Sequence, residues 1–275
     1  MIKIDGKKIS QEILDKLKNE PKIKKFMAVF LVGSDLASEN FVKKKESIAK
    51  ELGVDFRVYR LDEKLTGDKL KEKMRPIISS KLCGGVVLQL PLPSGVNSSY
   101  VLNSIPPEKD PDVLSERSLG SFYNHRSKIV PPSAGTVESI LVNLDISVSS
   151  LKSVAIVGQG TLIGKPITNW FLGKIPKIIS LDKGDDFSIL KEVDLVILGT
   201  GQSGLFEAQM FKKGAGVIDF GYGKNIEGKL MGDFDEKSIA FVGDDYLDFY
   251  TPTPGGTGPI LIARLFENFY QLNGK

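Results

Sequence analysis

The chain has 275 residues, of which 41% are hydrophobic and 26% are charged, and its formal net charge is +3. This composition is typical of a globular protein, and the mixed charges give no reason to expect a nucleic-acid partner. No run of about 18 apolar residues is present, so we expect no membrane-spanning helix and no membrane partner.

Cys83 and His125 are the only cysteine and the only histidine. One cysteine cannot form a disulfide framework, and neither residue has neighbours that suggest a metal site or a Ser-His-Asp triad. The first ten residues lack the apolar core of a secretory signal peptide. We therefore expect a cytoplasmic protein without a metal ion.

The first 90 residues alternate between strand-like and helix-like patterns, which is typical of a mostly parallel α/β fold. The expected order is an amphipathic segment over 9–17, a strand over 27–33, a helix over 38–52, a strand over 54–61, a helix over 68–79 and a strand ending at Gln89. These elements form two βαβ units.

Prolines and glycines between 106 and 135 interrupt the alternation and indicate a crossing to a second domain. A second α/β series begins at Leu151, and an amphipathic helix over 259–271 ends the chain. The strand-like segments of this series are 152–158, 176–182, 193–201, 216–221 and 239–244. We predict two α/β lobes with a cleft between them.

A glycine-rich turn opens the second lobe, with Gly158, Gly160 and Gly164 after a β-branched strand. Such a turn lets a pyrophosphate approach the backbone and the next helix N-terminus. It does not fit the ATP phosphate loop, because Pro166 follows the lysine. The next strand ends in Asp182, where dinucleotide folds place an acid on the ribose 2′-hydroxyl. These features predict a nicotinamide dinucleotide site and favour NAD over NADP.

Lys45 interrupts the apolar stripe of the helix predicted over 38–52. A buried ammonium has a lowered pKa unless a partner compensates, so Lys45 is a candidate for proton transfer. The alternative is a lysine whose stem covers apolar surface while its charge reaches water.

Gln89 ends a buried strand and is followed by Pro91 and Pro93, which stiffen the loop. A rigid loop that presents a polar side chain at a strand end is typical of α/β binding sites, although an exposed amide in a turn is the simpler interpretation. Asp112 lies in a second candidate segment, 110–112, and Pro254, Gly255 and Gly256 form a third, where a bound ring could lie close to the backbone.

Seven segments, taken in order, resemble one family: VGSDLASENFVKKK, GGVVLQLPLPSG, PPEKDPD, VGQGTLIGKP, VIDFG, GKLMGD and TPTPGGTGP. It is the bifunctional methylenetetrahydrofolate dehydrogenase / methenyltetrahydrofolate cyclohydrolase family of the FolD type. The resemblance covers almost the entire chain.

This resemblance implies a folate-binding catalytic domain over 1–116 and 254–275 and a Rossmann-type NAD(P)-binding domain over 117–253. The last helix would return to the first lobe, and the protein would act on tetrahydrofolate derivatives as a cytoplasmic homodimer.

The resemblance also implies roles for single residues. Lys45 would transfer protons, Gln89 would hydrogen-bond it, and Asp112 would anchor the pterin ring. The loop of Pro254, Gly255 and Gly256 would close over the folate. The dinucleotide would lie against Gly158 and Gly160 and near Tyr222.

Four departures from the family pattern, at five positions, are present. Phe41 replaces a tyrosine of the folate site, and Val113 replaces a glycine after Asp112. Gln159 with Gly160 replaces an Arg-Ser pair suited to a 2′-phosphate, and Asp182 replaces a histidine-like position.

The last two changes favour NAD, whereas members of the family usually use NADP. The choice of coenzyme therefore stays open, with a slight preference for NAD. The alternatives are a dehydrogenase without cyclohydrolase activity, a catalytically degenerate folate-binding paralogue and a reductase similar to shikimate dehydrogenase.

Overall fold

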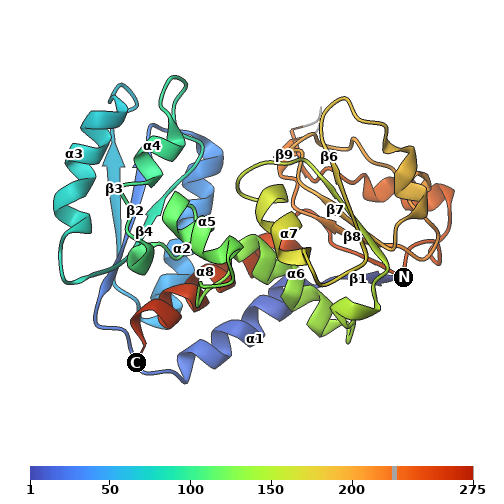
Figure 1. Ribbon diagram of the computed structural model, residues 1–275, viewed down its shortest axis with the longest axis horizontal. Coiled ribbons are helices and arrows are strands. Elements are labelled where there is room, and N and C mark those ends of the chain that lie inside the picture. Colours follow the sequence, from blue (N-terminus) through green and yellow to red (C-terminus); the bar gives the residue numbers. More distant parts are fainter. Residues whose placement is uncertain (225–227, 275) are drawn as a thin grey trace. The chain divides into compact units, whose positions relative to one another are not determined.

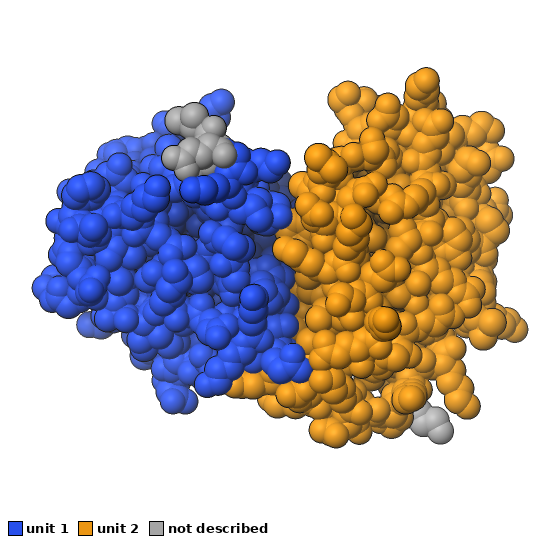
Figure 2. All heavy atoms as spheres, turned by 180° about the vertical axis from the view of Figure 1, so that it is seen from behind, with its two compact units in different colours: residues 1–11, 133–261 blue, residues 12–132, 262–275 orange. Residues whose placement is uncertain are grey.

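The computed structural model describes residues 1–224 and 228–274. The chain divides into two compact units, coloured separately in Figure 2: unit 1 holds residues 1–11 and 133–261, and unit 2 holds 12–132 and 262–275. In the described residues, no helix is both long and apolar enough for a bilayer crossing. The expected limits of the folate-binding domain, 1–116 with 254–275, and of the NAD(P)-binding domain, 117–253, remain predictions.

Unit 2 is built on a parallel three-stranded sheet in the order β3-β2-β4 (Figure 1). Its strands are β2 (Phe26–Val32), β3 (Phe56–Leu61) and β4 (Cys83–Leu88). Every residue of β2 and β4 is buried, as expected for parallel strands covered on both faces. Helices of this unit are α2 (Leu36–Leu52), α3 (Gly67–Ile78), α4 (Ser98–Leu102) and α5 (Glu116–Tyr123), with a 3₁₀ turn, η1, at Pro107–Lys109.

Local signals explain where α2 begins and ends. The Asp35 carboxylate accepts a hydrogen bond of 2.7 Å from the Ser38 backbone N–H, and so caps the first turn. Gly53 ends the helix with φ of 68°, a left-handed conformation that favours glycine.

Helix α8 (Thr257–Asn273) enters unit 2 at residue 262 and packs against β4. A Cβ on Gly85 would lie 2.7 Å from the Phe269 ring, and one on Gly84 would lie 2.6 Å from the Asn273 side chain. The close approach of helix and strand therefore requires these two glycines. This confirms that the last helix returns to the first lobe.

Unit 1 contains a parallel six-stranded sheet in the order β1-β11-β8-β7-β5-β6. The strands are β1 (Ile2–Lys3), β5 (Ser153–Val157), β6 (Lys177–Leu181), β7 (Leu195–Leu198), β8 (Gly216–Asp219) and β11 (Phe249–Tyr250). Helix α1 (Gly6–Lys18) begins in unit 1 and passes into unit 2 at residue 12. Helix α6 (Pro132–Asn143) lies in unit 1 except for its first residue, and α7 (Gly164–Phe171) lies wholly in unit 1.

Shorter elements complete unit 1. They are an antiparallel pair, β9 (Gly223–Lys224) and β10 (Leu230–Met231), and the 3₁₀ helices η2 (Val148–Ser150), η3 (Phe187–Glu192), η4 (Ala208–Met210) and η5 (Glu236–Phe241). The core combines aliphatic side chains with aromatic ones, among which Phe206 and Phe234 both pack against Phe211.

Most of the predicted elements are confirmed within a few residues, but one is wrong. The segment 239–244 was expected to be strand-like, whereas η5 and a turn occupy it. The Asp235 carboxylate accepts a hydrogen bond of 3.0 Å from the Lys237 N–H and caps the start of this short helix. This local bond outweighs the β-propensity of Ile239, Phe241 and Val242.

Candidate active site

Lys45 and Gln89 meet in unit 2, although 44 positions separate them in the sequence. The Lys45 Nζ donates a hydrogen bond of 3.0 Å to the Gln89 Oε1. Gln89 follows β4 at its carboxyl end, and its own Nε2 donates to the Leu90 carbonyl at 2.8 Å. Because this second bond fixes the amide, the oxygen rather than the nitrogen faces the lysine.

Burial lowers the pKa of the Lys45 ammonium from its usual value, and the negative charge of Asp112 partly opposes this. Lys45 is half-buried, whereas Lys43 and Lys44 on the same helix are exposed. No acid lies within ion-pair distance of Lys45 in the described residues. A lysine with a lowered pKa and one amide partner is suited to exchange protons.

Asp112 lies on the loop between η1 and α5, where its half-buried carboxylate has no hydrogen-bond partner in the described part of the chain. Burial raises the pKa of Asp112, Lys45 lowers it, and the neighbouring Asp110 raises it. Asp110 itself is buried and accepts from the backbone N–H groups of Leu114 and Ser115 at 3.1 and 2.8 Å. Asp110 thus shapes the loop, and Asp112 is left available to a ligand.

Val113 stands where the family pattern has glycine, and it adopts φ of 56° while fully buried. This is the left-handed conformation that only glycine adopts without cost. The loop therefore keeps a glycine-type backbone despite the valine, rather than changing its shape.

Phe41 lies on α2, one turn before Lys45, and is half-buried. The Lys44 Nζ lies 5.5 Å from the centre of its ring. The ring keeps the stacking surface of an aromatic residue, but it has no hydroxyl that could join the Lys45–Gln89 hydrogen bond.

The glycine-rich turn of unit 1 lies between β5 and α7 and has the geometry that a dinucleotide requires. Gly158 has φ of 90°, and a Cβ on Gly164 would lie 1.9 Å from the Gly158 carbonyl oxygen. A Cβ on Gly160 would meet nothing within 4 Å. No side chain caps the first turn of α7. The open space at Gly160 fits a pyrophosphate, whereas the N–H groups of Lys165 and Ile167 are already bonded to the Gly160 and Ile163 carbonyls.

Gln159 and Asp182 differ in what they offer to a ligand. The Gln159 Nε2 donates to the Ile156 carbonyl at 2.9 Å, and its Oε1 accepts from Thr168 at 3.3 Å, so this amide is already bonded. Asp182 is exposed directly after β6, and β6 pairs with β5 through Val157 and Leu181. Asp182 therefore follows the strand that pairs with β5, the strand that leads into the glycine-rich turn.

The third candidate segment connects β11 to α8 in unit 1. Gly255 has φ of 106°, and a Cβ on Gly256 would lie 2.5 Å from the Pro252 carbonyl oxygen. Pro254 is exposed and follows a cis peptide bond. The Gly6 N–H donates to the Gly255 carbonyl at 3.0 Å, so the start of α1 supports this loop. Tyr222, which precedes β9 in the same unit, is half-buried.

The structure thus brings Lys45, Gln89, Asp112 and Phe41 together in unit 2. The other predicted residues belong to unit 1, and they are Gly158, Gln159, Gly160, Gly164, Asp182, Tyr222, Pro254, Gly255 and Gly256. The single histidine, His125, is exposed.

Sequence reasoning missed three buried polar residues: Asp219, Asp233 and Asn268. The Asn268 Nδ2 donates to the carbonyls of Pro111 and Val130 at 2.8 and 2.7 Å, and so holds the residue before Asp112. The only signal in the sequence was a polar residue on the apolar face of the last helix, next to Leu265, Phe266 and Phe269.

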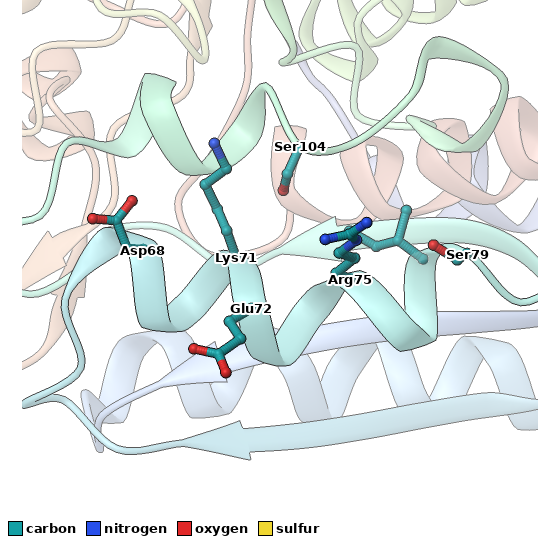
Figure 3. A pocket seen from close by; sticks show the side chains of 7 residues that line it. Asp68, Lys71, Glu72, Arg75, Ser79 and Ser104 are labelled. Atoms are coloured by element: carbon teal, nitrogen blue, oxygen red, sulfur yellow. The ribbon is translucent and has the colours of Figure 1, made fainter.

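A surface pocket of about 450 Å³ lies along α3, and Figure 3 shows the side chains around it. It is lined by Asp68, Lys71, Glu72, Arg75, Ile78, Ser79 and Ser104. Both acids have partners, since Tyr100 donates to Asp68 at 2.5 Å and Lys69 pairs with Glu72 at 2.7 Å. None of the predicted site residues lines this pocket, and its mixed charges indicate no ligand class.

Two family models match the chain. Residues 4–112 match the tetrahydrofolate dehydrogenase/cyclohydrolase catalytic domain, and residues 131–275 match the NAD(P)-binding domain of the same family.

The Lacticaseibacillus casei protein named bifunctional protein FolD is 32% identical over 278 residues, which cover 98% of this chain and 96% of that protein. The protein of the same name from Agathobacter rectalis is 32% identical over 273 residues, which cover 96% of both chains. The crystal structure of the bifunctional enzyme FolD, methylenetetrahydrofolate dehydrogenase/cyclohydrolase, from Campylobacter jejuni superposes with a TM-score of 0.90 at 29% identity. That alignment covers 98% of this chain and 97% of that one.

The two matched domains span nearly the whole sequence, and the two relatives align over 96% of their own length. The chain therefore belongs to the tetrahydrofolate dehydrogenase/cyclohydrolase family.

Proposed function

We propose that this protein oxidises 5,10-methylenetetrahydrofolate to the 5,10-methenyl form with NAD(P), and hydrolyses that product to 10-formyltetrahydrofolate. Both family domains and the name of the relatives support this pair of activities. Within the chain, the observation that carries the proposal is the hydrogen bond between Lys45, whose pKa is lowered, and Gln89.

The oxidation needs orientation more than acid–base chemistry. A nicotinamide coenzyme, when bound, accepts the hydride that leaves the methylene carbon. The folate product is a methenyl cation stabilised by its two nitrogens, so no proton has to be removed. The task of the protein is therefore to hold the folate. We assign this task to the Asp112 carboxylate, the Phe41 ring and the loop of Pro254, Gly255 and Gly256.

The hydrolysis does need proton transfer. Water adds to the methenyl carbon, the bond from that carbon to N5 breaks, and the formyl group stays on N10. Of the two protons that the water loses, one goes to N5 and the other to solvent. A neutral Lys45 amine accepts the first proton and returns it to N5, while Gln89 holds the amine in place.

A test of this assignment compares Lys45→Met with the exposed control Lys43→Met on the same helix. Methenyl hydrolysis is followed by the absorbance of the methenyl product. We expect Lys45→Met to lose at least about a hundredfold in hydrolysis, which is the usual contribution of a general acid–base group, while folate still binds. Lys43→Met should behave as the parent. Parent-like hydrolysis by Lys45→Met would overturn the role of the lysine.

We propose NAD as the preferred coenzyme. Asp182 places a negative charge after β6, and it would repel a 2′-phosphate while it accepts from a ribose hydroxyl. Gln159 is held by Ile156 and Thr168, so it adds no cation. We further propose that the protein acts as a homodimer in the cytoplasm, as the resemblance implies.

The same absorbance assay decides between the remaining alternatives. Formation of the methenyl product that decays only at the buffer rate would identify a dehydrogenase without cyclohydrolase activity. No turnover with either coenzyme would identify a degenerate paralogue. The family match argues against a reductase similar to shikimate dehydrogenase.

A further inference from the structure

Two carboxylates, those of Asp219 and Asp233, are buried in unit 1 and belong to none of the roles above. Asp219 ends β8 and is 1% exposed, and Asp233 follows β10 and is 0% exposed. A Cβ on Gly221 would lie 2.3 Å from the Asp233 Oδ1, and one on Gly232 would lie 1.9 Å from the Asp219 Oδ2. The backbone of each segment is therefore pressed against the carboxylate of the other.

Asp233 shapes the turn that follows β7. Its Oδ2 accepts from the Thr200 N–H at 2.5 Å, from the Thr200 hydroxyl at 2.9 Å and from the Gly201 N–H at 3.2 Å. This turn touches the glycine-rich coenzyme turn, because a Cβ on Gly158 would lie 2.5 Å from the Gly199 carbonyl oxygen. Asp233 thus fixes the backbone next to the first coenzyme glycine.

Asp219 holds the segment around the Pro254–Gly256 loop. Its carboxylate accepts from the N–H groups of Gly221 at 2.6 Å and Phe234 at 3.0 Å. Its backbone N–H donates to the Thr251 hydroxyl at 2.7 Å, and its carbonyl accepts from the Thr257 hydroxyl at 2.8 Å. These threonines lie on either side of the loop, so both loop ends are tied to β8.

The two acids also affect each other electrically. Burial raises the pKa of Asp219 to about 7, and the negative charge of Asp233 adds to this effect. Burial also raises the pKa of Asp233, whose Oδ1 has no hydrogen-bond partner among the described residues. Two adjacent buried carboxylates resist carrying two negative charges.

Among the described residues, the surroundings of the pair offer backbone N–H groups and threonine hydroxyls rather than a cation. Thr253, which donates to the Gly221 carbonyl at 3.3 Å, also donates its N–H to Glu236 at 3.3 Å. Glu236 is paired with Lys3 at 2.7 Å, and both affect the pKa of Tyr250 on β11. The charges of Lys3 and Glu236 therefore compensate each other.

We propose that Asp219 and Asp233 are a positioning pair for coenzyme binding. The Asp233 carboxylate holds the Gly199–Gly201 turn, and the Asp219 carboxylate holds Gly221 and Phe234, while the backbone of Asp219 holds Thr251 and Thr257. The inference rests on the proposed coenzyme site of unit 1. It adds two residues that act through the backbone and do not touch the coenzyme.

The test is a titration of the parent with NADH and with NADPH between pH 6 and 8.5, with the tighter-binding coenzyme used for the variants. The pair gains a second charge as the pH rises through about 7, and this loosens the loops. We expect the Kd of the parent to rise over this range by up to about tenfold per pH unit above the transition. A Kd that does not change with pH would overturn the proposal.

Two variants separate positioning from charge. Asp233→Asn keeps an acceptor oxygen for Thr200 but loses its charge, so we expect a Kd about tenfold higher than that of the parent at pH 6. Asp219→Asn leaves Asp233 as the single charge, so the pH dependence should disappear while the Kd at pH 6 stays close to that of the parent. The exposed control Asp245→Asn should follow the parent.

The outcomes are distinguishable even if one variant does not fold. If Asp219→Asn is unfolded, the pH dependence of the parent Kd and the Kd of Asp233→Asn still test the proposal. A Kd of Asp233→Asn equal to that of the parent would overturn it. Folate binding, measured separately, should be unchanged in both variants. If the parent itself binds neither coenzyme, the proposed coenzyme site is wrong, and the inference falls with it.

Discussion

At the scale of single residues, the departures from the family pattern differ in what they change. Val113 keeps the backbone conformation of the glycine that it replaces. Phe41 keeps a ring but loses a hydroxyl. Asp182 changes the sign of the charge that a ribose would meet. Only the last of these bears on the choice of coenzyme.

Replacing Val113 with glycine should cost little. The change releases about 1–2 kcal/mol of left-handed strain and loses about 1.5–3 kcal/mol of side-chain burial. We expect the free energy of unfolding, measured in urea, to fall by about 1 kcal/mol. The control is Val87→Gly in β4, a buried valine that lies within a strand, which should cost well over 2 kcal/mol. Equal losses in the two variants would contradict strain at Val113.

Replacing Asp182 with serine should shift the coenzyme preference. Removal of the carboxylate removes its repulsion of a 2′-phosphate, so kcat/KM for NADP relative to NAD should rise by about tenfold. Asp244→Ser, which removes an exposed acid elsewhere in unit 1, is the charge control. An unchanged ratio in Asp182→Ser would show that this acid does not meet the ribose.

At the scale of elements, the last helix contributes to unit 2 through packing and hydrogen bonds. Phe269 fills the space beside Gly85, and Asn268 bonds the loop before Asp112. The strands and helices were predictable because burial gives each of them a period in the sequence. Asn268 was not, because its role depends on two carbonyls more than a hundred positions away.

Replacing Asn268 with alanine should leave the carbonyls of Pro111 and Val130 without their donor. We expect a loss of about 2 kcal/mol or more in unfolding free energy and a higher KM for methylenetetrahydrofolate. Coenzyme affinity should not change, because these contacts lie within unit 2. The control is Gln271→Ala, an exposed position on the same helix. A higher Kd for the coenzyme with an unchanged folate KM would contradict the role of Asn268.

The candidate site was predictable only in part. Lys45 stood out because a charge interrupts an apolar stripe, and the glycine-rich turn stood out by its spacing. The partnership of Lys45 with Gln89 needed the resemblance, because nothing local joins α2 to the end of β4. Asp219 and Asp233 resemble ordinary turn acids in the sequence, and their burial is decided by two glycines, Gly221 and Gly232.

At the scale of the whole molecule, the buried acid of unit 1 has a consequence for stability. The pKa of Asp219 is about 7 in the folded chain and near 4 in the unfolded one. Between pH 4 and pH 7 the Asp219 carboxyl binds its proton more tightly in the folded state than in the unfolded state. Its protonation therefore stabilises the folded state, and this contribution is fully present below pH 4. Its contribution is lost progressively as the pH rises to 7.

The free energy of unfolding of the parent, relative to that of Asp219→Asn, should therefore fall from pH 5 to pH 8. Trp170, the only tryptophan, lies in unit 1 and is 5% exposed, so its fluorescence in urea reports the unfolding of that unit. Asp245→Asn provides the control, because its pKa is lowered and its effect falls outside this range. A constant difference across the range would contradict the raised pKa.

The pairing of β1 with β11 also sets the order in which the chain becomes structured during synthesis. Ile2 and Lys3 pair with Phe249 and Tyr250, and the Ile4 N–H donates to the Tyr250 carbonyl at 2.9 Å. Ile2 and Lys3 thus wait for partners that are synthesised 247 positions later, whereas the sheet of unit 2 needs only residues 26–88. An interrupted translation product that ends before residue 249 would expose the edge of β8 as an unpaired strand, open to pairing with other chains.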